Sequence, residues 1–290
     1  MIFHRFFDII IEENGKVRPK MKLLTAKNGV KYIISDLLRA PHAFATRTGG
    51  VSELSHTESL NLAFGRGDSD ETVIENLRLF GEAVGFAPES VISLPQIHSD
   101  RVLTVGASDG GEGYFRHTDR ACDGYVTTER GVTLGVKTAD CVPILLEARD
   151  GDGKVFAVSA IHSGWRGTAQ TIVARGVEEL LALGATPDRI FAAIGPCIGG
   201  DCYEVDADCR AALEAVNRGR GCIAEGEDGK YFPDLAALNR LILLDCGLPE
   251  GNVDVCRLCT HCESELFYSH RRQNGPRGTM LSVIFMPLSS

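Results

Sequence analysis

No stretch of this 290-residue chain is apolar for long enough to span a bilayer, which takes about 20 residues. The opening segment, residues 2–11, is apolar but is interrupted by Arg5 and Asp8. It also lacks the small-residue cleavage site of a secretory signal peptide. We therefore expect a cytoplasmic protein that has no membrane partner.

The chain also lacks an excess of basic residues, since 30 Lys and Arg face 39 Asp and Glu, which leaves a formal net charge of −9. Binding to nucleic acid depends on basic groups that neutralise phosphates, so this balance argues against a nucleic-acid partner. Low-complexity tracts and internal repeats of about 20–50 residues are absent as well, which excludes solenoid architectures. The hydrophobic content of 44% is that of an ordinary globular protein.

Ten cysteines are present, but the chain is long and carries no export signal, so the pattern does not fit a secreted disulfide framework. We expect mostly reduced thiols. Four of them lie in or beside apolar helical patterns and are predicted to be structural thiols: Cys202, Cys209, Cys222 and Cys246.

A dense cysteine cluster occupies residues 256–262, with the sequence Cys-Arg-Leu-Cys-Thr-His-Cys. Cys256 and Cys259 have the spacing of a zinc half-site, and Cys262 repeats that spacing with Cys259. A four-ligand zinc centre would still need a partner pair, and no second Cys pair completes one. We therefore predict that Cys256 and Cys262 do not form a zinc ribbon and that these thiols lie near a strand end.

Strand-like segments rich in Val, Ile and Phe recur along the chain and are bounded by Gly, Pro or Asp. They cover residues 42–47, 101–105, 132–136, 142–147, 155–161, 189–194 and 281–285. Helical patterns follow the cap Ser69, run from Thr168 to Gly184, and cover residues 206–216 and 233–246. Because strands outnumber helices and several follow one another directly, the sequence favours an α/β (α+β) fold in which helices cover sheet layers.

The domain organisation follows from the spread of the candidate site residues, which extend from the first third of the chain to its last tenth. This spread predicts a single domain over residues 21–290. Met21 follows a basic, polar segment, so residues 1–20 are predicted to be a peripheral N-terminal extension.

Three short peptides stand out chemically, centred on His98, Cys141 and His162. They read Pro-Gln-Ile-His-Ser-Asp, Thr-Ala-Asp-Cys-Val-Pro and Ile-His-Ser-Gly-Trp-Arg-Gly-Thr. Two imidazoles and one thiolate are the three protein ligands that a catalytic zinc centre retains while its fourth position stays open. The sequence therefore predicts a zinc site, although each residue alone also fits an ordinary structural role.

The loop after His162 joins a predicted strand to the helix predicted to open at Thr168. Two glycines in this loop allow a ligand to approach the backbone, and Trp165 and Arg166 lie between them. The free N–H groups of a helix start suit a phosphate or a developing oxyanion. The structural alternative is a tight strand-to-helix turn around a buried tryptophan.

Cys141 would ionise readily beside imidazoles and a metal, and it is then either a metal ligand or a nucleophile. Asp140 precedes it and is either a proton carrier or a group that orients its neighbours. Arg47, at a strand end, is placed to meet an anion, and Asn61 puts an amide into an apolar run. Arg271 lies in an aromatic and basic segment that suits a purine ring or a phosphate. Turn chemistry or a solvated basic edge explains these last three residues as well.

Together these peptides resemble those of the laccase-domain, or YfiH-like, proteins, once called multicopper polyphenol oxidoreductases and now regarded as purine nucleoside phosphorylases. The matches span residues 46–272 in order. They are Thr46-Arg47-x-Gly49-Gly50-Val51-Ser52, Asn61-Leu62, Gly67-Asp68, Gln96-Ile97-His98, Ala139-Asp140-Cys141-x-Pro143, His162-Ser163-Gly164-Trp165-Arg166-Gly167, Gly195-Pro196-Cys197-Ile198, Cys202-Tyr203-Glu204-Val205, Cys259-Thr260 and Phe267-Tyr268-Ser269-His270-Arg271-Arg272.

The resemblance implies a single domain with α/β/β/α layers, in which helices cover mixed sheets. It implies zinc, with copper as an alternative, on His98, Cys141 and His162. It also implies phosphorolysis of adenosine, inosine and methylthioadenosine, with adenosine deamination at the same site. Nucleoside and phosphate are then the small-molecule partners, and we expect a monomer or a weak homo-oligomer.

On this interpretation the catalytic residues are Cys141, His162 and Asp140, and the substrate-binding residues are Arg47, Asn61, Trp165, Arg166 and Arg271. We assign phosphate to Arg47 and to the helix start over residues 164–168. One segment departs from the family pattern, which follows the arginine pair with Asp-Gly-x-x-x-Gly-Arg. Here the corresponding residues are Gln273-Asn274-Gly275-Pro276-Arg277-Gly278.

Three other functions compete with this one. A copper-dependent polyphenol oxidase fits the ligand types, but a blue-copper site needs a nearby axial methionine. The chain has only Met1, Met21, Met280 and Met286, and none is close in sequence to a candidate ligand. A cysteine hydrolase that edits peptidoglycan precursors would use Cys141 as nucleophile and His162 as base. The third alternative is a metal-binding scaffold without catalytic activity.

Overall fold

Two β-sheets form the centre of the molecule in a computed structural model that describes residues 7–8 and 21–288. In spatial order, the first sheet holds β1 (Phe7–Asp8), β2 (Met21–Thr25), β3 (Lys31–Ser35), β4 (His42–Ala45), β15 (Met280–Phe285), β8 (Thr133–Thr138) and β5 (Val91–Ile92). The second holds β14 (Val253–Val255), β11 (Ile190–Ile194), β9 (Val142–Arg149), β10 (Val155–Ser163), β7 (Gly124–Thr127) and β6 (Val102–Thr104). A separate hairpin consists of β12 (Ile223–Glu225) and β13 (Tyr231–Pro233).

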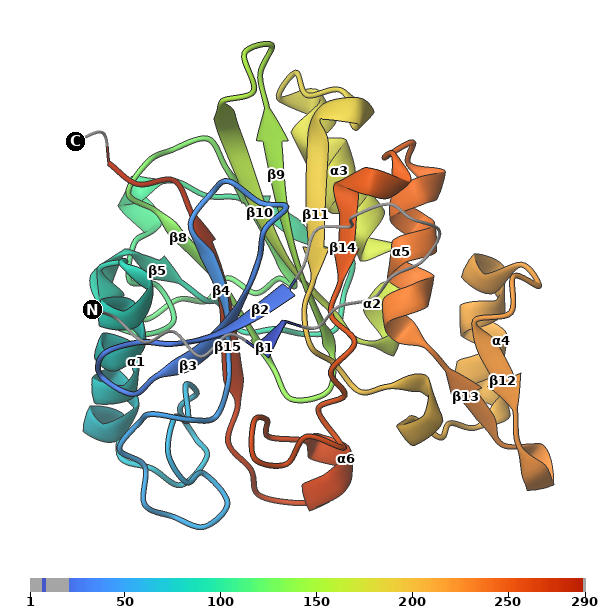
Figure 1. Ribbon diagram of the computed structural model, residues 1–290, viewed down its shortest axis with the longest axis horizontal. Helices are drawn as coiled ribbons and strands as arrows, with labels where there is room; N and C mark the ends of the chain where they lie inside the picture. Colours follow the sequence, from blue (N-terminus) through green and yellow to red (C-terminus); the bar gives the residue numbers. More distant parts are fainter. Residues whose placement is uncertain (1–6, 9–20, 289–290) are drawn as a thin grey trace.

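The two sheets pack face to face, and helices cover their outer sides (Figure 1). Strands β8 and β15 of the first sheet contact β9 and β10 of the second. Helix α1 (Asp70–Val84) contacts β4, whereas α3 (Ile172–Ala182) and α5 (Leu235–Asp245) cover the second sheet. Helices α2 (Trp165–Ala169) and α4 (Ala207–Asn217) pack beside α5, and the short α6 (His270–Gln273) precedes β15. The α/β/β/α layering expected from the family resemblance is thus confirmed.

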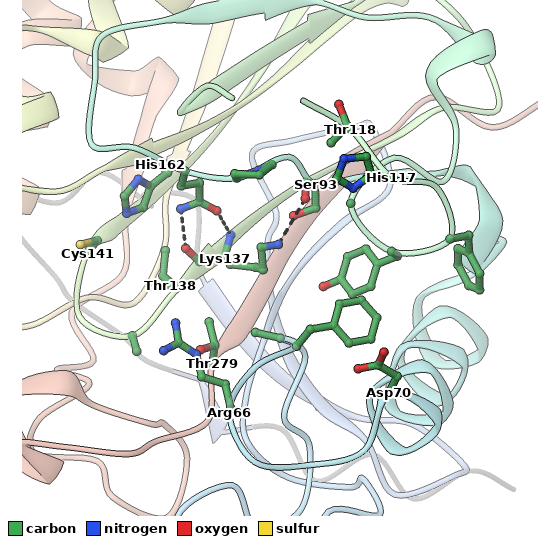
Figure 2. Close-up of a pocket in the computed structure, with 18 of the residues that line it drawn as sticks. Arg66, Asp70, Ser93, His117, Thr118, Lys137, Thr138, Cys141, His162 and Thr279 are labelled. Atoms are coloured by element: carbon green, nitrogen blue, oxygen red, sulfur yellow. Dashed lines mark hydrogen bonds between the residues drawn. The ribbon is translucent and has the colours of Figure 1, made fainter. Parts of the chain in front are cut away.

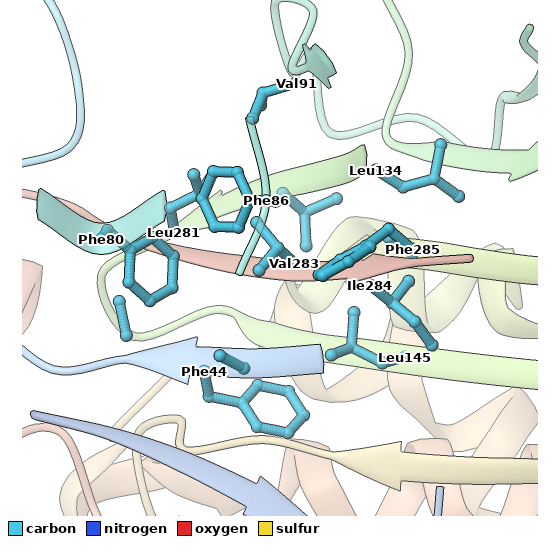
Figure 3. Close-up of a cluster of buried hydrophobic side chains, with 14 of the residues drawn as sticks. Phe44, Phe80, Phe86, Val91, Leu134, Leu145, Leu281, Val283, Ile284 and Phe285 are labelled. Carbon is cyan, nitrogen blue, oxygen red and sulfur yellow. The ribbon is translucent and has the colours of Figure 1, made fainter. Parts of the chain in front are cut away.

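The apolar core forms two clusters that correspond to these layers. One fills the space between the sheets and beneath α1, with Phe44, Leu145 and Val283 among its buried members (Figure 3). The other lies between the second sheet and the helices that cover it. All six residues of β15 are buried, because this strand is central in its sheet and covered on both faces. The core therefore fixes the ends of β8, β9 and β10, where the candidate site lies.

Most predicted elements are present within a few residues of their expected ends. All seven predicted strands are found, and Ser69 caps α1 by accepting a hydrogen bond from Thr72 N. The helix predicted to open at Thr168 was wrong in its start, because α2 begins at Trp165, immediately after the Gly164 N-cap. Thr171 has a φ of 57° and separates α2 from α3. Among the described residues, no helix is long and apolar enough to cross a membrane.

The structure bears on the predictions for the free thiols and for several single cysteines, and it corrects one of them. All ten thiols are free. Cys209 lies buried in α4 and Cys246 caps the end of α5, as expected of structural thiols. Cys202 does not lie in an apolar helix but in a half-exposed 3₁₀ turn, Gly200–Cys202. The predicted extension over residues 1–20 lies outside the described residues except for Phe7–Asp8, which pairs with β2.

Gly195, just after β11, marks a close approach between the two sheets. A Cβ atom there would lie 2.2 Å from the Phe44 ring. We expect Gly195→Ala to lower the free energy of unfolding by about 1–3 kcal/mol, because the packed core cannot absorb an added methyl group. Gly251→Ala is the matched control, since a Cβ there meets nothing within 4 Å. Denaturant unfolding midpoints measure both, and equal midpoints would contradict this account of the core.

Candidate active site

The side chains of His98, Cys141 and His162 converge on one point between the sheets. His162 lies near the end of β10, Cys141 lies in the turn that passes from β8 in one sheet to β9 in the other, and His98 lies in the loop between β5 and β6. One ligand atom from each residue lies within 4.8 Å of the others. The two imidazole rings meet edge to face with centroids 5.0 Å apart. The three residues singled out in the sequence thus form one group that could hold a metal ion.

Asp123, just before β7, organises this group. Its fully buried carboxylate accepts hydrogen bonds from the backbone N–H groups of Ile97, His98 and Ser99, at 3.2, 3.0 and 2.7 Å. The same carboxylate lies 2.9 Å from Nδ1 of His162. This contact directs Nε2 of His162 toward the remaining ligands, as carboxylates do behind many metal-binding histidines. The sequence did not single out Asp123, although an acid directly before a buried strand is a usable signal.

Charge within the group is set by close contacts. Burial opposes ionisation, yet the Cys141 sulfur and the Asp123 carboxylate together raise the pKa of His162 to about 9. Burial likewise opposes the Cys141 thiolate, but His162 and then His98 lower the pKa of that thiol to about 6. Despite its burial, Asp123 has a pKa of about 2 because of its bonds to His162 and Ser99. Without a metal, the group is therefore a thiolate–imidazolium pair at neutral pH, and a bound ion displaces the proton.

One candidate ligand, His98, and the neighbour of another, Asp140, adopt a backbone conformation that L-residues rarely take. His98 has a φ of 58° and Asp140 a φ of 98°. Asp123 holds the first of these through its loop hydrogen bonds. Asp140 is held by its own carboxylate, which accepts bonds from Thr260 Oγ1 at 2.6 Å and from Arg271 N at 2.7 Å. Such strain persists only where the surroundings fix it, which is common at functional sites.

Gly164 leaves room at the ligands themselves. A Cβ atom at this position would lie 3.1 Å from Cys141 Sγ and 3.1 Å from His98 Cδ2. Hydrogen bonds of the preceding residue hold the turn at Gly164 in place: Ser163 Oγ lies 2.9 Å from Thr168 Oγ1 and 3.0 Å from Asn239 Oδ1. The glycine that was expected to admit a ligand to the backbone therefore does border the candidate metal position.

The group opens into a cavity of about 720 Å³, which is in the size range of small-molecule sites. His98, Cys141 and His162 form part of its wall. Figure 2 shows Cys141 and His162 at one side of the view, Arg66, Lys137 and Thr279 in the middle, and Asp70 and His117 at the other side. Phe64, Tyr114 and Phe115 add aromatic surface to the lining. The cavity thus joins a metal-binding end to cationic and aromatic surfaces.

Four cationic side chains line this cavity. Arg116 donates to Ser108 O and Gly110 O, and the other three are Arg66, Lys137 and Arg277. The Nε atoms of Arg66 and Arg277 are buried and have no hydrogen-bond partner. Burial first and the neighbouring Arg66 second lower the pKa of Lys137 to about 8, and the same two causes lower the pKa of Arg277. Like charges held together with unsatisfied donors are what an anion would stabilise. The sequence reading missed all three, although Lys137 is the one charged residue in the apolar strand β8.

The substrate-binding residues predicted from the sequence do not line this cavity. The Arg47 guanidinium donates to Ser264 O at 3.2 Å and lies 4.8 Å from the centre of the Tyr268 ring. Asn61 is buried and bonds to Ala63 O and Asp68. Arg166 lies over Trp165, and Arg271 donates to Glu204 O. Asp140 is also absent from the lining.

The sheets, the ligand group and the cavity define an α/β/β/α protein with a candidate metal site. The chain belongs to the family of multi-copper polyphenol oxidoreductase laccases, whose model matches residues 41–287. A purine nucleoside phosphorylase of Deinococcus radiodurans is 38% identical over 269 residues, covering 93% of this chain and 94% of its own. Adenosine deaminase RL5, from an unknown prokaryotic organism, is 34% identical and covers 84% of this chain and 93% of its own. The crystal structure of YlmD from Geobacillus stearothermophilus superposes with a TM-score of 0.82 at 33% identity, covering 97% of this chain and all of that one.

Asp123→Asn tests the orienting contact. We expect the affinity for a probe ion, zinc or cobalt, to fall about 10–100-fold, because the amide neither fixes the His162 tautomer nor raises its basicity. Competition with a chelator measures the affinity. Asp100→Asn is the control, because this neighbouring carboxylate makes only an outer contact with Arg175 at 3.7 Å. An unchanged affinity in a folded Asp123→Asn protein would remove Asp123 from the metal site.

The thiol of Cys141 should be reactive when no metal is bound. At pH 7, a thiol with a pKa of about 6 is roughly 90% thiolate, whereas burial raises the pKa of Cys246 to about 11 and leaves it protonated. Both thiols are half-buried, so access is matched. Alkylation followed by peptide mass spectrometry should find Cys141 modified first and protected by zinc. Equal modification rates for the two thiols would refute the ion pair with His162.

Proposed function

We propose that this protein is a zinc-dependent purine nucleoside phosphorylase that acts on adenosine, inosine and methylthioadenosine, and that the same site deaminates adenosine. The observation that carries this proposal is one cavity that combines the metal-binding group with Arg66, Lys137 and Arg277. The activities for which the relatives are named, purine nucleoside phosphorylase and adenosine deaminase, support it. We also propose that the protein is a monomer or weak homo-oligomer of the cytoplasm, since its ten thiols are free.

His98, Cys141 and His162 would hold the ion, because two nitrogens and one sulfur fit zinc with a fourth position open. A bound zinc supplies Lewis acidity and an activated water, which deamination requires. Asp123 keeps the His162 ring oriented for this role. The space next to Gly164 leaves the position beside the ligands free for substrate.

We assign phosphate to Arg66, Lys137 and Arg277 rather than to Arg47. The buried, unpaired Nε atoms of Arg66 and Arg277, and the repulsion of Lys137 and Arg277 by Arg66, favour a bound dianion. Both terminal nitrogens of the Arg47 guanidinium, by contrast, already donate to backbone carbonyls. Arginine also suits phosphate because its planar fork donates two parallel hydrogen bonds. Phosphorolysis needs the phosphate held against the ribose while the purine leaves, so this cluster supplies both position and charge.

The nucleoside would lie along the cavity beside this phosphate position. Phe64, Tyr114 and Phe115 offer aromatic faces on which a purine can stack. The Phe64 and Tyr114 rings are 5.5 Å apart and tilted by 56°, so one ring supports the other. In the view of Figure 2, Arg66 and Lys137 lie between Cys141 and His162 on one side and Asp70 and His117 on the other, so a phosphate there could reach a ribose from the middle of the cavity.

The other residues proposed from the sequence act on the site through their neighbours. Asp140 serves as a positioning group rather than a proton carrier, because both of its oxygens accept bonds from Thr260, Ser269 and Arg271. Arg271 provides one of these bonds through its backbone. Asn61 secures the loop before Arg66 by bonding to Asp68 at 2.8 Å. Trp165 and Arg166 form the start of α2, which follows the Gly164 turn.

A cysteine hydrolase remains the second candidate, because Cys141, His162 and Asp123 also have the arrangement of nucleophile, base and orienting acid. The presence of His98 argues against the hydrolase, because a nucleophile–base–acid triad does not need a second histidine, whereas a metal site uses it as a third ligand. A copper oxidase has less support. Met280 Sδ accepts a hydrogen bond from Tyr268 N in the core and is not part of the ligand group.

The direct test is product analysis with the purified, zinc-loaded protein. We expect adenosine and phosphate to give adenine and ribose 1-phosphate, and adenosine without phosphate to give inosine. Cys141→Ala should abolish both reactions, because both need the metal. Arg66→Ala and Arg277→Ala should each raise the KM for phosphate about 10–100-fold while deamination changes little, because only phosphorolysis holds an anion.

Arg47→Ala distinguishes the two phosphate assignments. If it raises the phosphate KM while Arg66→Ala and Arg277→Ala do not, the sequence-based assignment to Arg47 is right and the cavity assignment is wrong. Full phosphorolysis by Cys141→Ala would refute the metal-centred mechanism. Cleavage of a peptidoglycan precursor by a protein that leaves adenosine untouched would establish the hydrolase instead.

A further inference from the structure

A second group of metal-binding side chains lies outside the catalytic cavity. Cys202, His261 and Cys262 each place one ligand atom within 4.8 Å of the other two, and the two sulfurs are 3.4 Å apart. None of these residues lines the cavity. Cys202 comes from the turn after β11 and the other two come from the loop after β14, so two chain segments some 60 residues apart in sequence meet here.

Cys259 adds a third sulfur to this group. Its side chain interacts with those of both Cys202 and Cys262. Its sulfur also accepts a hydrogen bond from Gly199 N at 3.1 Å. Backbone N–H donors of this kind stabilise a thiolate and hold the sulfur in place before any ion arrives. Three sulfurs and one imidazole from two chain segments therefore come together here.

This donor set has a specific chemistry. Three thiolates and one imidazole are a common ligand set of structural zinc, in which sulfur lies about 2.3 Å and nitrogen about 2.0–2.1 Å from the ion. Tetrahedral geometry then places ligand atoms roughly 3.5–3.8 Å apart. The Cys202 and Cys262 sulfurs are 3.4 Å apart, and the ligand atoms of Cys202, His261 and Cys262 lie within 4.8 Å of one another. Cys259 is not in that group, so its sulfur would have to approach the other three ligand atoms when an ion binds. Cys262 is exposed and Cys202 and His261 are half-exposed, which gives an ion direct access from solvent.

The cluster is joined to the wall of the catalytic site. Cys197 and Cys259 form an isolated parallel bridge, in which Thr260 N donates to Cys197 O at 2.9 Å. Thr260 Oγ1 in turn bonds to the carboxylate of Asp140, beside Cys141. An ion bound to the loop would fix the position of Thr260, and with it the strained Asp140 backbone.

We propose that Cys202, Cys259, His261 and Cys262 form a second, structural zinc site that ties the loop after β14 to the turn after β11. This site is separate from the candidate catalytic metal and does not depend on the proposed enzymatic activity. It completes the zinc half-site of Cys259 and Cys262 with ligands that are distant in sequence. Cys256 takes no part, because it is buried away from the group.

The test counts zinc in purified protein that lacks the first site. Cys141→Ala should bind one zinc per chain, and adding Cys202→Ser and Cys262→Ser should reduce this to none. Adding Cys222→Ser and Cys246→Ser instead is the matched control, because both are half-buried thiols that belong to neither group, and this variant should retain one zinc. Cys141→Ala loaded with cobalt in place of zinc should show intense thiolate-to-cobalt absorption. This absorption should disappear when Cys202→Ser and Cys262→Ser are added.

Cys262→Ser alone is the milder variant if the combined one fails to fold, since this residue is exposed. It should weaken zinc binding in the Cys141→Ala background by at least about 10-fold. Absence of zinc and of cobalt–thiolate absorption in Cys141→Ala would overturn the proposal. So would an unchanged affinity in Cys262→Ser. Recovery of a Cys202–Cys262 disulfide from metal-free protein would also overturn it and identify a redox pair instead.

Discussion

The buried carboxylate of Asp123 is the constraint on which the candidate site depends. The carboxylate accepts hydrogen bonds from three successive backbone N–H groups and from the Ser99 hydroxyl, and it contacts Nδ1 of His162. The backbone carbonyl of Asp123 also accepts a hydrogen bond from His162 N at 2.7 Å. One side chain thus holds the left-handed His98 loop and orients the second imidazole. A buried carboxylate is costly unless its lone pairs are satisfied, and here the ligand loop itself satisfies them. Removing this charge would release two of the three ligands together.

The sheets determine where this constraint acts. The turn from β8 to β9 passes from one sheet to the other, and Cys141 lies in it, so the close packing of the sheets fixes the thiol relative to His162 on β10. The cationic residues come from different elements: Lys137 from β8, Arg66 from the loop before α1, and Arg277 from the segment before β15. Only the folded sandwich brings these charges together. A cluster of like charges is unstable alone, which is why it indicates an anionic ligand.

The sequence predicted the layered fold and the three side chains that meet at the candidate metal site, because each leaves a local trace. Val- and Ile-rich runs indicate strands, and His98, Cys141 and His162 each lie in an unusual polar peptide. The candidate anion site left only a weak trace, the charge of Lys137 in the apolar strand β8. Arg66, Lys137 and Arg277 lie far apart in the sequence and become a group only in three dimensions. Arg47 was chosen for its strand end, but its side chain turns toward Ser264 and Tyr268. Cys202 was misjudged for the same reason, because its partners lie some 60 residues away. The start of α2 was missed because Gly164 caps a helix without a side-chain signal.

The central claim is that one cavity holds a metal and a phosphate side by side, and a diffraction experiment at the zinc absorption edge tests it most directly. Crystals of the zinc-loaded protein soaked with phosphate and a non-cleavable inosine analogue should show an anomalous peak among His98, Cys141 and His162. They should also show a phosphate on Arg66 and Arg277, with the analogue beside it. A cavity without zinc at these ligands, or with phosphate bound only at Arg47 and the start of α2, would contradict the account.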